Sequence, residues 1–133
     1  MLEQLQSTGK IYVAEPWASL LVTGKKEIET AHMRLPAQYI GRWLDVQAAG
    51  GRRLGRIRFS GYKRYDSAED FNRDYELHLV PAGNQFHYDN RRQTFGWQVE
   101  RFEAETPRKV APDLAVHYHP SMISLLHKLI LCS

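Results

Sequence analysis

The sequence holds a single cysteine, Cys132, and no long apolar run. One cysteine cannot form an internal disulfide, which favours a reducing, intracellular setting. No segment approaches the roughly 18 apolar residues that suggest a membrane-spanning helix, and the first residues lack the charged-then-apolar pattern of a signal peptide. We therefore expect a cytoplasmic protein with no membrane segment.

Several motifs that assign a chemistry by themselves are also missing. The chain has no internal repeat, no glycine-rich phosphate loop, no cysteine–histidine zinc pattern and no Gly-x-Ser-x-Gly nucleophile elbow. His117 and His119 fall on one side of an extended segment, but no clear third ligand accompanies them. The sequence thus predicts neither a metal nor another cofactor.

What is present is a globular composition in 133 residues, with 43% hydrophobic and 25% charged side chains, which suits one domain with a real core. The formal net charge is only +3. Basic residues nevertheless concentrate between positions 42 and 64, where Asp45 is the only acid: Arg42, Arg52, Arg53, Arg56, Arg58, Lys63 and Arg64. A local basic surface is expected there, and such a surface favours a polyanionic ligand.

Residues 15–24 predict a short helix. Pro16 suits its first turn, where no N–H is needed, and Trp17, Leu20 and Leu21 recur on one apolar face. Gly24 ends it, because glycine tolerates the left-handed conformation common after a last turn.

Lys26 and Glu29 follow that glycine at a helix-to-strand turn. A regular strand over residues 26–31 would point them to opposite faces. They can share a cleft only through a bulge, or if Lys26 precedes the strand. Without other information, the ordinary interpretation is a solvated pair.

The remaining patterns predict strands at 11–13, 43–48, 53–65 and 94–103, a one-turn helix or loop at 35–41, a turn at 49–51, a helix at 67–78 capped by Ser67, and a loop at 80–92. The first nine residues are expected to be a loose start. Short strands interleaved with a few helices favour an α+β domain on a curved, mostly antiparallel sheet. Met122, Leu125, Leu126, Leu129 and Ile130 form an amphipathic stripe that would dock on the domain or on a partner.

Two of these elements carry candidate ligand contacts. On the strand at 53–65, Arg56, Arg58 and Tyr62 share the polar face and could bind phosphates and stack on a base, or could simply be a solvated exterior. On the helix, His78 falls on the buried face, as a core histidine or as a general base lining a cleft. The long loop, with Phe86, His87 and Tyr88, could cover a ligand.

Two adjacent segments resemble the signature of the ASCH family (activating signal cointegrator homology): Pro16-Trp17-Ala18-Ser19-Leu20 and Gly24-Lys25-Lys26-Glu27-Ile28-Glu29-Thr30. The family hallmark is Gly-x-Lys-x-x-Glu-x-Arg. Ala31 occupies the arginine position here, and Arg34 is its nearest replacement. The similarity continues through residues 59–65, 67–78 and 95–97, so it spans roughly residues 11 to 108. We therefore divide the chain into an ASCH domain, 1–110, and a C-terminal extension, 111–133, with a short amphipathic helix.

The resemblance implies a PUA-like fold, in which a small β-barrel carries peripheral helices and the motif lines a cleft beside the barrel. PUA-like barrels commonly bind RNA, and some ASCH proteins have been described as ribonucleases. RNA or a modified nucleoside is therefore the expected ligand, and hydrolysis of it is an open possibility. The candidate catalytic residues are Lys26, Glu29, Tyr62 and His78. The candidate substrate-binding residues are Trp17, Ser19, Arg34, Arg56, Arg58 and Arg64.

Two alternatives remain. Other small ASCH proteins deacetylate N4-acetylcytidine with a lysine, a threonine and a glutamate. By resemblance Lys26 would be the base, Glu29 occupies the threonine position, and Thr30 or Ser19 would have to supply the hydroxyl. The second alternative is a non-catalytic interaction domain that binds a protein partner, or a second copy of itself, through the C-terminal stripe.

Overall fold

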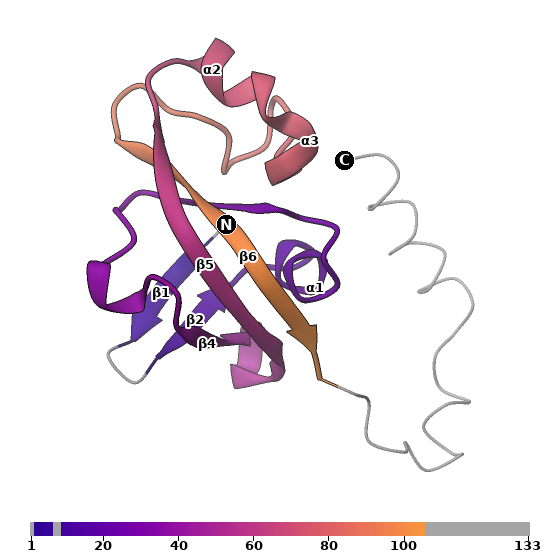
Figure 1. Ribbon diagram of the computed structural model, residues 1–133. Helices are drawn as coiled ribbons and strands as arrows, with labels where there is room; N and C mark the ends of the chain where they lie inside the picture. Colours follow the sequence, from indigo (N-terminus) through magenta and orange to yellow (C-terminus); the bar gives the residue numbers. More distant parts are fainter. Residues whose placement is uncertain (1, 7–8, 106–133) are drawn as a thin grey trace, which may run out of the picture.

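Six strands form one mixed sheet that curls into a nearly closed, barrel-like layer (Figure 1). The computed structural model describes residues 2–6 and 9–105. The strands are β1 (Leu2–Gln6), β2 (Lys10–Val13), β3 (Ile28–Ala31), β4 (Trp43–Gln47), β5 (Arg53–Tyr65) and β6 (Thr94–Ala104). Their order in the sheet is β1-β2-β4-β5-β6-β3, with β2 and β4 parallel and every other pair antiparallel. The expected α+β class with a mostly antiparallel, curved sheet is confirmed.

Short helices surround this sheet. α1 (Trp17–Val22) lies beside the barrel, whereas α2 (Ala68–Arg73) and α3 (Tyr75–His78) lie beyond the end of β5 (Figure 1). Two single-turn 3₁₀ helices, η1 (Ala37–Tyr39) and η2 (Ala49–Gly51), precede and follow β4. A six-residue helix is too short to be stable alone, so α1 depends on the five side chains that it buries: Trp17, Ala18, Leu20, Leu21 and Val22. No helix in the described ranges is long and apolar enough to cross a membrane.

The core fills the space between α1 and the inner face of the sheet. Fully buried side chains include Ile11, Leu44, Ile57, Phe59 and Trp97. The Phe59 and Trp97 rings meet edge to face, with centroids 5.5 Å apart. Phe59 belongs to β5 and Trp97 to β6, so this contact joins the two longest strands of the sheet within the core.

Most elements lie where the sequence predicts them, and β5 matches residue for residue. The loose start is wrong: residues 2–6 form β1, which pairs with β2 across a register shift between Leu2 and Gln4. That irregularity removes the simple alternation by which a strand is recognised. The helix at 67–78 is two helices with a break at Asp74, whose carboxylate accepts hydrogen bonds from Lys63 and Tyr65, both at 2.8 Å.

The expectations for residues 111–133, including the amphipathic stripe and the His117 and His119 pair, lie outside the described residues. The boundary at residue 110 stays a prediction.

Candidate functional site

Lys26 is placed by the way in which α1 ends. Gly24, at φ +80°, allows its N–H to reach Leu21 O at 3.2 Å while the Lys25 N–H reaches Leu20 O at 3.0 Å, the paired bonds of a Schellman motif. The Lys26 N–H shares Leu20 O at 3.0 Å. Strand β3 begins only at Ile28, so Lys26 lies in the turn before it. Lys26 and Glu29 are therefore not bound by the alternation of a strand and can face the same site.

Lys26 and Glu29 are both fully buried, so the interpretation as a solvated pair is wrong. Burial lowers the pKa of the Lys26 amine from 10.5 to about 8, and the negative charge of Glu29 opposes that shift. Glu29 lies opposite Trp97 of β6 in the register of the sheet. An amine and a carboxylate therefore share a water-poor site between the end of α1 and the start of β3.

The end of α3 closes this site. The Lys26 ammonium donates a hydrogen bond to the backbone carbonyl of His78. Leu79 has the left-handed conformation (φ 60°), and its carbonyl accepts from the Trp17 indole at 3.2 Å. Trp17 in turn meets Phe86 edge to face, with centroids 5.3 Å apart. Two side chains near the N-terminus thus hold the start of the 79–93 loop against the site.

The His78 ring is part of the core. Its Nδ1 accepts from the Val80 N–H at 3.0 Å, so Nε2 carries the proton and donates to Phe71 O at 2.7 Å. The ring stacks on Phe71, with centroids 4.0 Å apart. Burial lowers the pKa of His78 to about 4. His78 therefore meets Lys26 through its backbone, while both ring nitrogens are occupied.

The other candidate residues lie away from this centre or have partners of their own. Ser19 donates from Oγ to Glu15 at 2.6 Å, and its N–H does so at 2.8 Å. Thr30 lies on the face of β3 opposite to Glu29, because successive strand residues alternate. Tyr62 is 39% exposed on β5, with its ring against Phe95.

Ala31, at the motif's arginine position, is buried opposite Phe95, and the exposed Arg34 follows three residues later. The structure thus brings Trp17, Lys26, Glu29 and the His78 backbone together, and it does not place an arginine side chain at position 31.

The basic stretch of β5 faces acids that the sequence window does not contain. Arg56 pairs with Glu103 at 2.8 Å and Arg58 with Glu100 at 2.9 Å, both across the strand boundary to β6. The Arg56 guanidinium also stacks on Trp43, at 4.2 Å from the ring centroid. This face is therefore close to charge balance rather than strongly basic.

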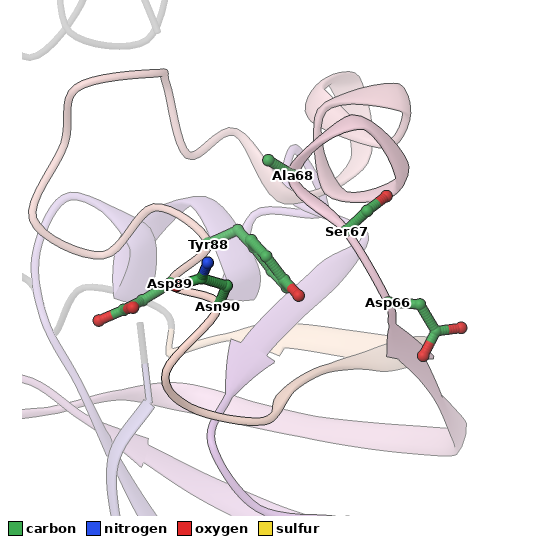
Figure 2. Close-up of a pocket in the computed structure, with 6 residues that line it drawn as sticks. All are labelled: Asp66, Ser67, Ala68, Tyr88, Asp89 and Asn90. Carbon is green, nitrogen blue, oxygen red and sulfur yellow. The ribbon is translucent and has the colours of Figure 1, made fainter.

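A second feature is a pair of adjoining hollows between the end of β5 and the 79–93 loop, lined in part by Arg64 and Tyr88, which the sequence had indicated as ligand contacts. The larger, about 520 Å³, is lined by Asp66, Ser67, Ala68, Tyr88, Asp89 and Asn90 (Figure 2). The smaller, about 180 Å³, shares Asp66, Tyr88 and Asn90 with it and adds Arg64, Tyr65, Arg91, Arg92 and Gln93. In the sequence, the Arg91-Arg92 pair close to Tyr88 is another feature that could have indicated a ligand site here. The contact between this loop and residues 64–68 arises only when the chain folds.

No family model and no curated protein matches the sequence. Among solved structures, the fold is similar to the crystal structure of ASCH from Zymomonas mobilis, with a TM-score of 0.61 and 13% identity over 84% of this chain and 82% of that one. A point mutant of the same protein gives a TM-score of 0.59 and 11% identity over 91% of this chain and 99% of that one. This chain has the ASCH fold.

The ASCH fold confirms the PUA-like architecture that the motif resemblance implied. Gly24, Lys26 and Glu29, at the motif positions, lie at the junction of α1 and β3 in that fold. At such low identity the similarity extends to the fold alone and assigns neither a ligand nor a chemistry to this chain.

Proposed function

We propose that this ASCH-fold protein binds RNA, or a nucleoside derived from it, at the Lys26–Glu29 site. The observation that carries the proposal is the complete burial of a lysine and a glutamate at the two motif positions. Burying charge is unfavourable, and apolar side chains of similar size would usually fill such a space with equal or better stability. A function that needs both groups explains why they are there.

The hydrogen bond from Lys26 to the His78 carbonyl suggests the kind of ligand. The His78 carbonyl oxygen occupies the position that the Lys26 ammonium binds. A ligand that displaces this carbonyl would therefore have to present a similar oxygen acceptor. Uracil carries such a carbonyl next to an N–H donor, and cytosine carries one on the same edge as its amino donor, with the N3 acceptor between them. Either donor would suit the nearby Glu29 carboxylate. Release of the loop start from Lys26 would open the site to the base.

The same geometry ranks the chemical alternatives. A lysine with a pKa of about 8 is partly neutral at mildly alkaline pH and can act as a base. A ribonuclease also needs an acid for the leaving oxygen, and the His78 ring nitrogens are both occupied. An N4-acetylcytidine amidohydrolase needs a hydroxyl, whereas Thr30 faces away from Glu29 and Ser19 is bonded to Glu15. Binding is therefore the function that the site supports best.

The experiment compares binding of cytidine and of a short single-stranded RNA to the wild type and to Lys26→Met/Glu29→Gln. This double variant keeps size and removes both charges together, so no lone charge is left buried. The chain offers a matched control in Lys25→Met/Glu27→Gln, because Lys25 and Glu27 are exposed neighbours of the same types. Chromatography of N4-acetylcytidine and of the RNA after incubation reports any turnover in the same samples.

We expect the Lys26/Glu29 double variant to lose at least tenfold in affinity while its melting temperature stays near or above that of the wild type. The control should bind like the wild type. Unchanged affinity in the double variant would make the buried pair structural. Absence of binding to the wild type would remove both cytidine and RNA as ligands.

A further inference from the structure

The two adjoining hollows beside Tyr88 would suit a small ligand with one anionic end. One hollow is large enough for the body of the ligand, and the other is smaller and lined by arginines. The larger hollow, about 520 Å³, falls within the range of small-molecule sites. The smaller, about 180 Å³, opens from it at Tyr88 and contains the arginines. A ligand with an aromatic or sugar part and a compact anion would match the two volumes.

Positive charge is concentrated in the smaller hollow. Arg64, Arg91 and Arg92 line it, whereas Asp66 is its one acidic lining residue. Arg64 Nε lies 3.2 Å from Asp66 Oδ1 in an exposed ion pair, which is weak and can exchange for a more highly charged anion. Arg92 is exposed and forms no ion pair with any residue in the described ranges. Two guanidinium groups are thus available at one small hollow.

Asp89, in the wall of the larger hollow, is bound mainly by Arg91, and its charge acts more weakly on Arg92. Arg91 holds its carboxylate with three side-chain hydrogen bonds of 3.0 to 3.3 Å, which keep the pKa of Asp89 at about 2. In Figure 2 the Asp89 side chain points away from the gap between Tyr88 and Asp66. The Asp89 carboxylate is therefore hydrogen-bonded to Arg91, whereas no hydrogen bond or ion pair joins it to Arg64 or to the Arg92 side chain among the described residues.

Tyr88 contributes an aromatic ring to both hollows. Its ring is half-buried and packs on Phe71, with centroids 6.2 Å apart. Figure 2 shows the ring reaching from the loop toward the side on which Asp66 lies, and Tyr88 lines both hollows. A partly packed aromatic ring next to arginines suits a nucleotide, since its base can stack while its phosphate is bound. Asp66 and Asn90 offer oxygen acceptors for hydroxyl or amino donors of a nucleoside.

We propose that this groove is a second ligand site, for a nucleoside phosphate, with the phosphate between Arg64 and Arg92 and the nucleoside against Tyr88. The residues that carry it are separate from Lys26 and Glu29, so the inference does not rest on the Lys26–Glu29 site. The recognised feature is the phosphate, which distinguishes this groove from a site that selects a base through its carbonyl.

The test is an NMR titration of the full chain, labelled with nitrogen-15, with cytidine monophosphate, with cytidine and with inorganic phosphate. We expect the monophosphate to shift the amides of residues 64–68 and 88–93, and cytidine to leave them unchanged at the same concentration. Arg64→Gln/Arg92→Gln should weaken monophosphate binding at least tenfold, as expected when charge-assisted hydrogen bonds are removed. Arg101→Gln, an exposed arginine on β6, is the matched control and should bind like the wild type.

Three results would overturn the inference. They are equal shifts with cytidine and its monophosphate, undiminished affinity in the Arg64/Arg92 variant, and no shift in residues 64–68 and 88–93. The two sites can be separated in the same spectra, because Lys26→Met/Glu29→Gln should leave monophosphate binding at the groove intact. Shifts confined to the surroundings of Lys26 would support the proposed function and reject the groove.

Discussion

Lys25 and Lys26 are adjacent, identical in chemistry and opposite in environment. Lys25 is exposed and Lys26 is fully buried, and the same contrast separates Glu27 from Glu29. Composition and local pattern assign all four to solvent, since lysine and glutamate are rarely buried. What selects one of each is the Schellman turn after α1, which fixes the direction of Lys26 before the strand begins. The motif resemblance singled out Lys26 and Glu29, the two that the structure buries, whereas residue statistics alone did not.

The lowered pKa of Lys26 predicts a pH dependence of stability. Between about pH 8 and pH 10.5 the unfolded chain keeps a proton that the folded chain has released, so the free energy of unfolding rises with pH in this window. The full gain is about 3 kcal/mol. Urea denaturation at several pH values should show this rise in the wild type and not in Lys26→Met. Parallel curves for the two proteins would mean that the amine is solvated in the folded state.

The lowered pKa of His78 predicts a pH dependence of stability at acidic pH. Its folded pKa of about 4 lies below the usual 6.5, so its contribution to stability is complete above about pH 6.5 and is lost as the pH falls toward 4. The melting temperature of the wild type should therefore fall more steeply over this range than that of His78→Gln, which cannot titrate. Equal slopes would show that protonation of His78 does not oppose folding.

At the scale of elements, β5 and β6 explain why the basic surface was overestimated. A sequence window between residues 42 and 64 contains one acid, but a strand's nearest charged neighbours lie on the adjacent strand. Glu100 and Glu103 come from β6 and meet Arg58 and Arg56 directly. Alternation along β5 was enough to predict its bounds, because that signal is local. The charge of its outer face was not predictable, because that depends on which strand pairs with it.

The ion pairs between these strands predict the effect of charge reversal. Arg58→Glu breaks the ion pair with Glu100 and brings two carboxylates together, so it should lower the free energy of unfolding by about 1 kcal/mol. Adding Glu100→Arg restores an opposite pair and should recover most of that loss. Urea midpoints of the single and double variants measure both steps. A double variant as unstable as the single one would show that Arg58 acts through its contact with Trp43 instead.

Gly96 shows how closely β3 and β5 approach β6. A Cβ at this position would lie 2.8 Å from Ile28 Cγ2 and 2.9 Å from the Tyr65 ring. Gly96→Ala should therefore destabilise the fold by about 2 kcal/mol through overpacking. Gly61→Ala, where the nearest atom to a new Cβ is 3.8 Å away, is the control and should change stability by less than about 0.5 kcal/mol. Thermal melts that coincide for the two variants would contradict the close packing.

On the scale of the whole molecule, patterns in the sequence determined more of the architecture than of the site. Alternation, a capped helix and the family motif led to a curved, mostly antiparallel sheet with peripheral helices, and the ASCH fold agrees. The groove at Tyr88 and the closure of Lys26 by His78 join residues far apart in the chain. Such contacts have no local signal, because they depend on how finished elements pack.

The location of the core predicts how a shortened chain behaves. The buried side chains of the described residues, from Ile11 to Trp97, form one cluster. A fragment of residues 1–110 should therefore keep a single cooperative thermal transition and the near-ultraviolet circular dichroism of the full chain. A fragment without fixed tertiary signals would show that residues 111–133 are needed to close the core.

The position of β3 in the sheet has a consequence for synthesis. β3 is an edge strand whose ladder partner among the described strands is β6, so Glu29 can be enclosed only after β6 has been made. On the ribosome, Lys26 and Glu29 therefore remain hydrated until almost the whole described chain has emerged. Their transfer out of water is then among the last steps of folding. An incomplete or prematurely released chain would keep both ions in solvent, so the motif is assembled only in a finished molecule.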